Sequence, residues 1–179
     1  MEIIDGIAGR EEPITALFRE TFSASEGAAE GRIVAGLAHD LLTLTPASDI
    51  RVFRVEETGR VIGAAIFSRL IYPMDTRRVM LLSPMAVAPD WQGCGVGQGL
   101  LRHALEALRA EGAEVALTYG DPAFYRRVGF APVTEAEVQP PLPLSAPHGW
   151  LGLSLAGDPM PALSGVPVCA AGLNRADIW

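Results

Sequence analysis

A glycine-rich segment in the middle of the chain has residue types and spacing suited to binding an anion. It reads Gln92-Gly93-Cys94-Gly95-Val96-Gly97. An apolar run at residues 79–87 precedes it, and a pattern typical of an amphipathic helix at residues 100–110 follows it. The first N–H groups of a helix lack partners within the helix and carry partial positive charge, and glycines let the backbone close around an anion. The segment therefore predicts a phosphate or pyrophosphate site at a helix N-terminus.

The spacing argues against two common phosphate-binding loops. A P-loop needs Lys and then Ser or Thr after its last glycine, but Gly97 is followed by Gln98 and Gly99. The dinucleotide fingerprint needs a different glycine register and a later acidic residue, whereas Glu114 precedes the next strand pattern. The interpretation that this segment binds the phosphates of a nucleotide is therefore a weak one.

The spacing that the segment does match is Gln-x-x-Gly-x-Gly, and in this the chain resembles the GCN5-related N-acetyltransferase (GNAT) superfamily. A second match, to the Tyr-x-x-x-Gly-Phe segment of that family, lies downstream as Phe124-Tyr125-Arg126-Arg127-Val128-Gly129-Phe130. The local match is similar to a YhbS-like subgroup of predicted acetyltransferases and includes the residues just before, Gly120-Asp121-Pro122. The resemblance is strong over residues 79–130 and looser elsewhere.

The resemblance implies an α/β (α+β) fold, the acyl-CoA N-acyltransferase fold, in which helices flank a mixed, mostly antiparallel sheet of about six to seven strands. It also implies one domain over residues 1–179. Within it we expect N-terminal strands and acceptor-side helices in 1–78, an acetyl-CoA-binding core in 79–130, and a proline-rich arm with the final strand in 131–179.

The resemblance also implies acetyl-CoA (coenzyme A) as cosubstrate, held largely by backbone groups. The implied cofactor-binding residues are Met85, Val87, Gln92, Gly93, Cys94, Gly95, Val96 and Gly97. Cys94 occupies a variable position of the motif, so we interpret it as a small residue that lends its N–H, not as a nucleophile. Tyr125 is the implied acid for the leaving thiolate, because a phenol of pKa about 10 is protonated at neutral pH. The alternative for Tyr125 is simple packing between helix and sheet.

The implied reaction moves an acetyl group from acetyl-CoA to a primary amine of a small molecule or peptide by direct attack. The sequence leaves the general base open among Asp121, Glu56, Glu26, Asp75 and a water chain through Ser83. Each acid is better explained as a helix cap or a solvated carboxylate than as a base. The alternative function is a non-catalytic acyl-CoA-binding module of the same fold.

Hydrophobic patterning predicts the elements that must position these residues. We expect strands at residues 2–7, 50–56, 60–70, 79–87, 115–119 and 150–155. Helices are expected to begin at Glu11, to span residues 26–39, and to follow the glycines over residues 100–110. A short helical turn is expected after Asp121. Pro84 interrupts a strand and indicates either an edge position or a bulge.

Composition narrows the function classes. A formal net charge of −7, from 14 basic and 21 acidic side chains, is not that of a nucleic-acid binder. No apolar run reaches the roughly 18 residues of a membrane span. Cys94 and Cys169 predict free thiols and a cytoplasmic protein. The histidines show no metal-binding spacing, so no metal site is expected. The sequence is compatible with a homodimer and with a monomer.

Overall fold

A seven-stranded sheet forms the centre of the protein, and the computed structural model describes residues 1–157 and 159–179. The strand order is β1-β2-β3-β4-β5-β7-β6; β4 and β5 run parallel, and the other neighbouring pairs are antiparallel. The strands are β1 Glu2–Asp5, β2 Ile50–Glu57, β3 Arg60–Leu70, β4 Val79–Val87, β5 Val115–Tyr119, β6 Ala131–Pro132 and β7 Trp150–Ser154. The mixed, mostly antiparallel sheet predicted from the sequence is confirmed.

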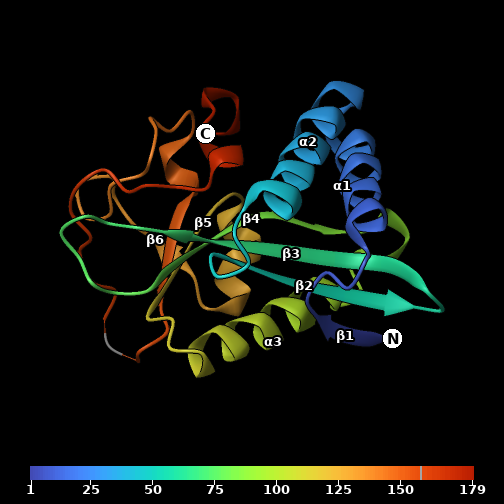
Figure 1. Cartoon of the computed structure of the whole chain (residues 1–179), viewed down its shortest axis with the longest axis horizontal. Coiled ribbons are helices and arrows are strands. Elements are labelled where there is room, and N and C mark those ends of the chain that lie inside the picture. The colour runs from blue at the N-terminus through green and yellow to red at the C-terminus, as the bar shows by residue number, and fades with distance from the viewer. Residues whose placement is uncertain (158) are drawn as a thin grey trace.

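Helices flank this sheet, with α1 and α2 packed side by side on one face and α3 on the other (Figure 1). The helices are α1 Glu11–Glu26, α2 Ala28–Leu44, α3 Val96–Ala110 and α4 Pro122–Tyr125. The second helix differs from its predicted range, because Gly27, at φ 98°, separates α1 from α2. The two helices approach closely at Gly31, where an added Cβ would lie 2.0 Å from Oγ of Ser23.

The β2–β3 hairpin supplies the buried middle of the sheet. Its two-residue turn, Thr58 and Gly59, has positive φ at both positions, which matches the twist of the strands it joins. Residues 61–67 of β3 are all buried, because α1 covers one face of the strand and α3 the other. The prediction that this apolar strand is covered on both faces is confirmed.

Strand β4 carries a bulge at Pro84. Ala65 pairs with Met85 and Phe67 pairs with Leu82, so Ser83 and Pro84 together face a single residue of β3. Strand β4 lies between β3 and β5, so the edge-strand alternative for Pro84 was wrong and the bulge alternative is confirmed. The parallel pairing with β5 also stops at Leu82, where it reaches Thr118. Beyond that point the two parallel strands part.

The C-terminal segment folds back toward the end of β5. Two short 3₁₀ turns, Ala171–Leu173 and Ala176–Ile178, lead to Trp179. The Trp179 ring stacks against Tyr119 at a centroid distance of 6.2 Å, and its Nε1 donates to the carbonyl of Leu173 at 2.8 Å. Local sequence pattern does not predict the structure of these residues, because Trp179 packs against a residue far away in the sequence, Tyr119.

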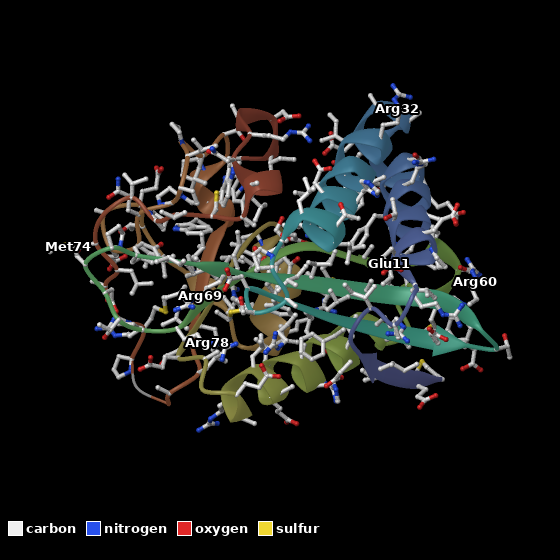
Figure 2. The ribbon with its side chains drawn as sticks, in the orientation of Figure 1. Glu11, Arg32, Arg60, Arg69, Met74 and Arg78 are labelled. Atoms are coloured by element: carbon white, nitrogen blue, oxygen red, sulfur yellow. The ribbon has the colours of Figure 1, made fainter. Side chains whose placement is uncertain are left out.

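Charged side chains occupy the periphery, as Figure 2 shows for Arg32 and Arg60. Arg60 pairs with Asp90 at 2.7 Å, while other surface arginines pair with acids across elements. Within residues 1–157 and 159–179, no helix is long and apolar enough to cross a membrane. The same residues contain no group of three or more His, Cys, Asp or Glu that could hold a metal ion.

Candidate active site

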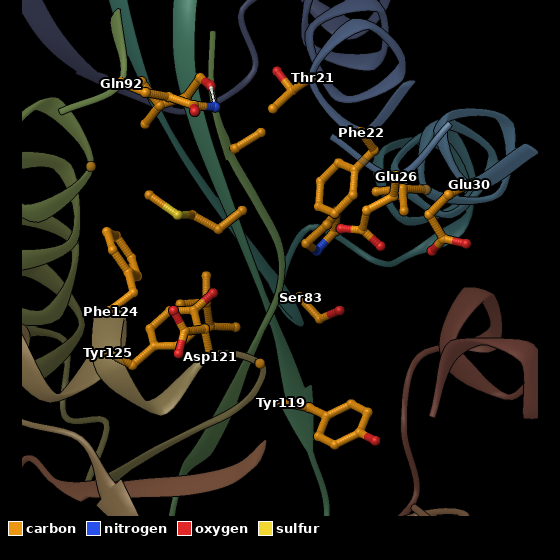
Figure 3. Close-up of a pocket in the computed structure, with 18 of the residues that line it drawn as sticks. Thr21, Phe22, Glu26, Glu30, Ser83, Gln92, Tyr119, Asp121, Phe124 and Tyr125 are labelled. Carbon is orange, nitrogen blue, oxygen red and sulfur yellow. Dashed lines mark hydrogen bonds between the residues drawn. The ribbon is translucent and has the colours of Figure 1, made fainter. Parts of the chain in front are cut away.

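A cavity of about 830 Å³ opens where β4 and β5 part (Figure 3). Its walls come from segments far apart in the sequence: the bulged half of β4, the glycine-rich turn before α3, the β5–α4 connection, the facing sides of α1 and α2, and the C-terminal segment. The gap between the strands therefore joins the two motifs found in the sequence to parts of the chain that carry no motif.

The glycine-rich turn forms one end of the cavity. Gly93 and Gly95 have φ of 74° and 82°, values that favour glycine, and Gly95 is the N-cap of α3. Nε2 of Gln92 donates to the carbonyl of Val87 at 2.9 Å and fixes the turn against the end of β4. The N–H groups of the first turn of α3 are thereby presented at the cavity with the positive end of the helix dipole.

Gly97 is required by the packing beneath this turn. A Cβ at Gly97 would lie 3.0 Å from Cε of Met85 and 3.1 Å from Cζ of Phe124. Gly99, two residues on, has no atom within 4 Å of such a Cβ. The three predicted glycines thus act differently: two shape the backbone and the third lets α3 approach β4 and α4.

The structure brings the predicted cofactor residues together, with one exception. The predicted positions that line the cavity are Met85, Val87, Gln92, Gly93, Gly95, Val96 and Gly97. Of the eight predicted positions, all of which the structure describes, Cys94 alone does not line the cavity. Its side chain is exposed, and its Sγ lies 3.5 Å from the carbonyl oxygen of Gln92. Because Cys94 does not line the cavity, any part it has in binding an anion there falls to its backbone N–H.

Tyr125 lines the cavity from α4. Asp121 caps that helix, its Oδ1 accepting from the N–H of Ala123 at 2.8 Å, as the sequence predicted. The Tyr125 ring packs edge-on against Phe130 at 5.8 Å, and the ring lies so close to Gly120 that a Cβ there would be 2.9 Å from Cε2. Burial raises the pKa of Tyr125. The phenol is therefore protonated at neutral pH and can act as a hydrogen-bond donor or an acid.

The structure reduces the candidate general bases. Glu56 lies outside the cavity lining, bonded to Arg54 at 2.8 Å and Arg10 at 3.2 Å, and Asp75 pairs with Arg77 at 3.4 Å. The remaining three line the cavity: Glu26, Ser83 and Asp121. Of these, Ser83 lies on the bulge itself, between the strands that part.

Sequence reasoning missed several residues of the cavity. They are Thr21, Phe22, Glu30, Arg127 and Trp179. Arg127 occupies a variable position of the second motif, and a basic side chain that close to a predicted phosphate site could have been noticed. The others come from the helices and the C-terminal segment, where no spacing pattern marks them.

Comparison with known proteins agrees with the geometry of this site. Residues 48–132, which include both motifs, match the family model described as acetyltransferase (GNAT) domain. Over these residues the chain is similar to a GNAT domain. Over 117 residues the protein is 35% identical to the uncharacterized N-acetyltransferase YjhQ of Escherichia coli, and over 118 residues it is 32% identical to YhbS of the same organism. The two matches cover 63% and 65% of this chain, and it spans just under two thirds of both relatives' own lengths, at 64% and 65%.

Solved structures of GNAT proteins share the fold of this chain. The crystal structure of E. coli YhbS in complex with CoA aligns with a TM-score of 0.82 and 25% identity, over 98% of this chain and 92% of that one. A GNAT family acetyltransferase from Brucella melitensis in complex with acetyl-CoA aligns with a TM-score of 0.70 and 24% identity, over 97% of both chains. The acyl-CoA N-acyltransferase fold and the YhbS-like resemblance expected from the sequence are confirmed.

Proposed function

We propose that this protein transfers an acetyl group from acetyl-CoA to a primary amine of a small molecule or peptide. The observation that supports this most is the parting of β4 and β5 at the bulge, which opens one cavity between the glycine-rich turn and Tyr125. The YhbS structure was solved with CoA and the Brucella melitensis structure with acetyl-CoA, which supports the same cofactor here.

In this proposal the cofactor is held by backbone groups. Its pyrophosphate lies on the N–H groups at the start of α3, with Arg127 as a nearby cation. Its pantetheine arm lies in the gap beside Met85 and Val87, where β4 has lost its β5 partner and can pair with an extended ligand. The thioester is then held beside the bulge, between Ser83 and Tyr125.

The transfer proceeds by attack of the neutral amine on the thioester carbonyl. The oxyanion that forms needs an N–H donor, which unpaired backbone near the bulge can supply. The carbon–sulfur bond then breaks, and the Tyr125 hydroxyl gives its proton to the leaving thiolate. The proton lost by the amine returns through water near Ser83 to the tyrosine. Direct attack of this kind depends chiefly on holding the two reactants together.

Thermal melting with acetyl-CoA, CoA and ATP tests the proposed cofactor. At about 100 times Kd, a ligand adds roughly 2.7 kcal/mol of stability. For a chain of 179 residues this corresponds to a rise on the order of 5–10 °C. We expect that rise with acetyl-CoA and CoA but not with ATP. An unchanged melting temperature with both CoA forms would contradict the proposal and make residues 92–97 an ordinary glycine-rich turn.

A further inference from the structure

The far wall of the cavity, opposite Tyr125, carries an excess of negative charge. The charged side chains that line the whole cavity are Glu26, Glu30, Asp121, Asp177 and Arg127. In Figure 3, Glu26 and Glu30 lie together on the side of the α1–α2 hairpin, while Asp121 and Tyr125 lie on the other side of Ser83. One basic side chain thus accompanies four acidic ones, and it belongs to the segment after α4.

Two of these acids are explained by the fold. Asp121 caps α4, and Asp177 pairs with Arg175 through two contacts of 2.5 Å and 3.1 Å. Glu26 and Glu30 have no hydrogen-bond or ion-pair partner among the residues that the structure describes. These two carboxylates are therefore the unbalanced charges of the cavity.

The position of Glu26 works against the stability of its own helix. It is the last residue of α1, where the helix dipole is negative, and the last turn of α1 contains no basic residue. Glu30, at the first turn of α2, brings a second negative charge to the same junction. Neighbouring like charges repel unless a cation lies between them. Glu26 is exposed and Glu30 is half-buried, so water screens this repulsion, and the junction is open to a cationic ligand whose ammonium would relieve it.

The wall next to these acids is apolar. Glu30, Val34 and Leu37 follow each other at helical spacing on one face of α2, and all three line the cavity. Phe22 of α1 contributes an aromatic ring to the same wall. Along this face the lining changes from charged at the hairpin junction to hydrocarbon toward the sheet, over about 10 Å for seven residues of helix.

A further polar group lies on the same side of the cavity. Thr21 of α1 is 7% exposed and lines the cavity, and its hydroxyl has no hydrogen-bond partner within the described part of the chain. A buried hydroxyl without a protein partner costs free energy, so this group is available to a polar ligand or to water in the cavity.

We propose, on the basis of the function proposed above, that the acceptor is an aliphatic diamine. Its distal ammonium binds between Glu26 and Glu30, and its hydrocarbon chain lies along Phe22 and Val34. Its other amine, as the neutral base, attacks the thioester carbonyl near Ser83. The carbon–nitrogen bond forms as the carbon–sulfur bond breaks, the thiolate takes the Tyr125 proton, and the nitrogen loses its proton through water to the tyrosine. The products are the N-acetylated diamine, still carrying one ammonium, and CoA.

Steady-state acetylation of putrescine and of n-butylamine, which has the same carbon chain and one amine, tests the inference. We expect kcat/KM for putrescine to exceed that for butylamine by about tenfold or more, since hydrogen bonds to charged groups are among the stronger ones. The difference should lie mainly in KM. In the double variant Glu26→Gln/Glu30→Gln, the ratio of kcat/KM for putrescine to that for butylamine should fall to near one, chiefly through a higher KM for putrescine.

The matched control is the double variant Glu12→Gln/Glu20→Gln, which removes the same charge from exposed positions of α1 outside the cavity. It should keep the preference for putrescine. Equal kcat/KM for the two amines in the wild-type protein would overturn the inference and leave the proposed function standing. Acetylation of neither amine, with acetyl-CoA still raising the melting temperature, would also overturn it. Failure of the proposed function is distinguished by the absence of that melting shift.

Discussion

The two ends of the cavity are built in different ways. At the cofactor end, a few consecutive residues between β4 and α3 present backbone groups, and their glycines have roles that follow from φ or from close packing. At the acceptor end, side chains from α1, α2 and the C-terminal segment converge from distant parts of the chain. The family model matches residues 48–132, which include the first end and leave out most of the second.

The two ends of the cavity should therefore differ in how strictly binding determines the sequence. Backbone recognition of a constant cofactor fixes a residue spacing, because each glycine has a geometric role. Side-chain recognition of an acceptor needs only that suitable groups meet in space, so it leaves each position free to change with the substrate. We therefore expect variants at the cofactor end to affect every acceptor alike, and variants at the acceptor end to change preference among acceptors.

The largest effect is expected at Tyr125, where the two ends meet. Tyr125→Phe should lower kcat by about 10²–10⁴-fold, the usual contribution of a general acid, while the melting shift with acetyl-CoA is kept. Because burial raises the pKa of Tyr125 and the protonated phenol is the active form, this group should not limit wild-type activity below the ordinary phenol pKa of about 10. A variant with wild-type kcat would show that the tyrosine only packs.

An intermediate effect is expected at the cofactor end. Gly97→Val places methyl groups against Met85 and Phe124, and overpacking of this kind costs about 1–3 kcal/mol, or roughly 5–150-fold in acetyl-CoA affinity if the turn moves to relieve it. Gly99→Val is the matched control, because its Cβ meets no atom within 4 Å. Titration calorimetry of both variants with CoA measures the difference. Equal loss of affinity in the two would show that packing beneath the turn does not matter.

A smaller effect is expected at Glu56, which ties the start of α1 to the sheet. Its carboxylate bonds to Arg54 and Arg10, and the Arg54 hydrogen bond lowers the pKa of Glu56 from its ordinary value of 4.5. Glu56→Gln should reduce the free energy of unfolding by about 1–3 kcal/mol at neutral pH.

The lowered pKa of Glu56 determines how the free energy of unfolding should change with pH. A lowered pKa in the folded state stabilises the protein above pH 4.5, and the contribution is lost as pH falls below that value. Urea unfolding of the wild type and of Glu56→Gln should therefore show a difference at pH 7 that narrows in acid. A difference independent of pH would mean that the carboxylate acts through packing instead of charge.

The fold was predictable where local pattern and tertiary structure agree. The bounds of β4 and β5 match their predicted ranges, because continuous apolar runs bounded by polar residues and glycines specify buried strands. Pro84 could not be assigned between an edge and a bulge, since a missing N–H is compatible with both and only the neighbouring strands decide. Strand β1 ends at Asp5, short of its predicted range, and β7 lies between β5 and β6, an order that no local signal contains.

The candidate site also has a part that the sequence predicts and a part that it does not. The turn from Gln92 onward was predictable because glycine spacing and a following helix define an anion site in a single stretch of chain. Glu30 and Trp179 were not predictable, because one looks like an ordinary first-turn acid and the other reaches the cavity only after the chain has returned past β5. Asp75 was among the open bases only because, from the sequence alone, any acid could reach the site.

In the described part of the chain, the cation of each surface ion pair is an arginine, a histidine or the terminal amine. Every one of the 14 basic side chains in the sequence is an arginine. A guanidinium stays protonated across the range in which proteins fold, whereas a lysine amine can lose its proton and attack a thioester. If the protein handles an activated acetyl group as proposed, its own side chains offer that group no competing amine. The charge of its side chains would then be immune to autoacetylation, whatever the supply of acetyl donor around it.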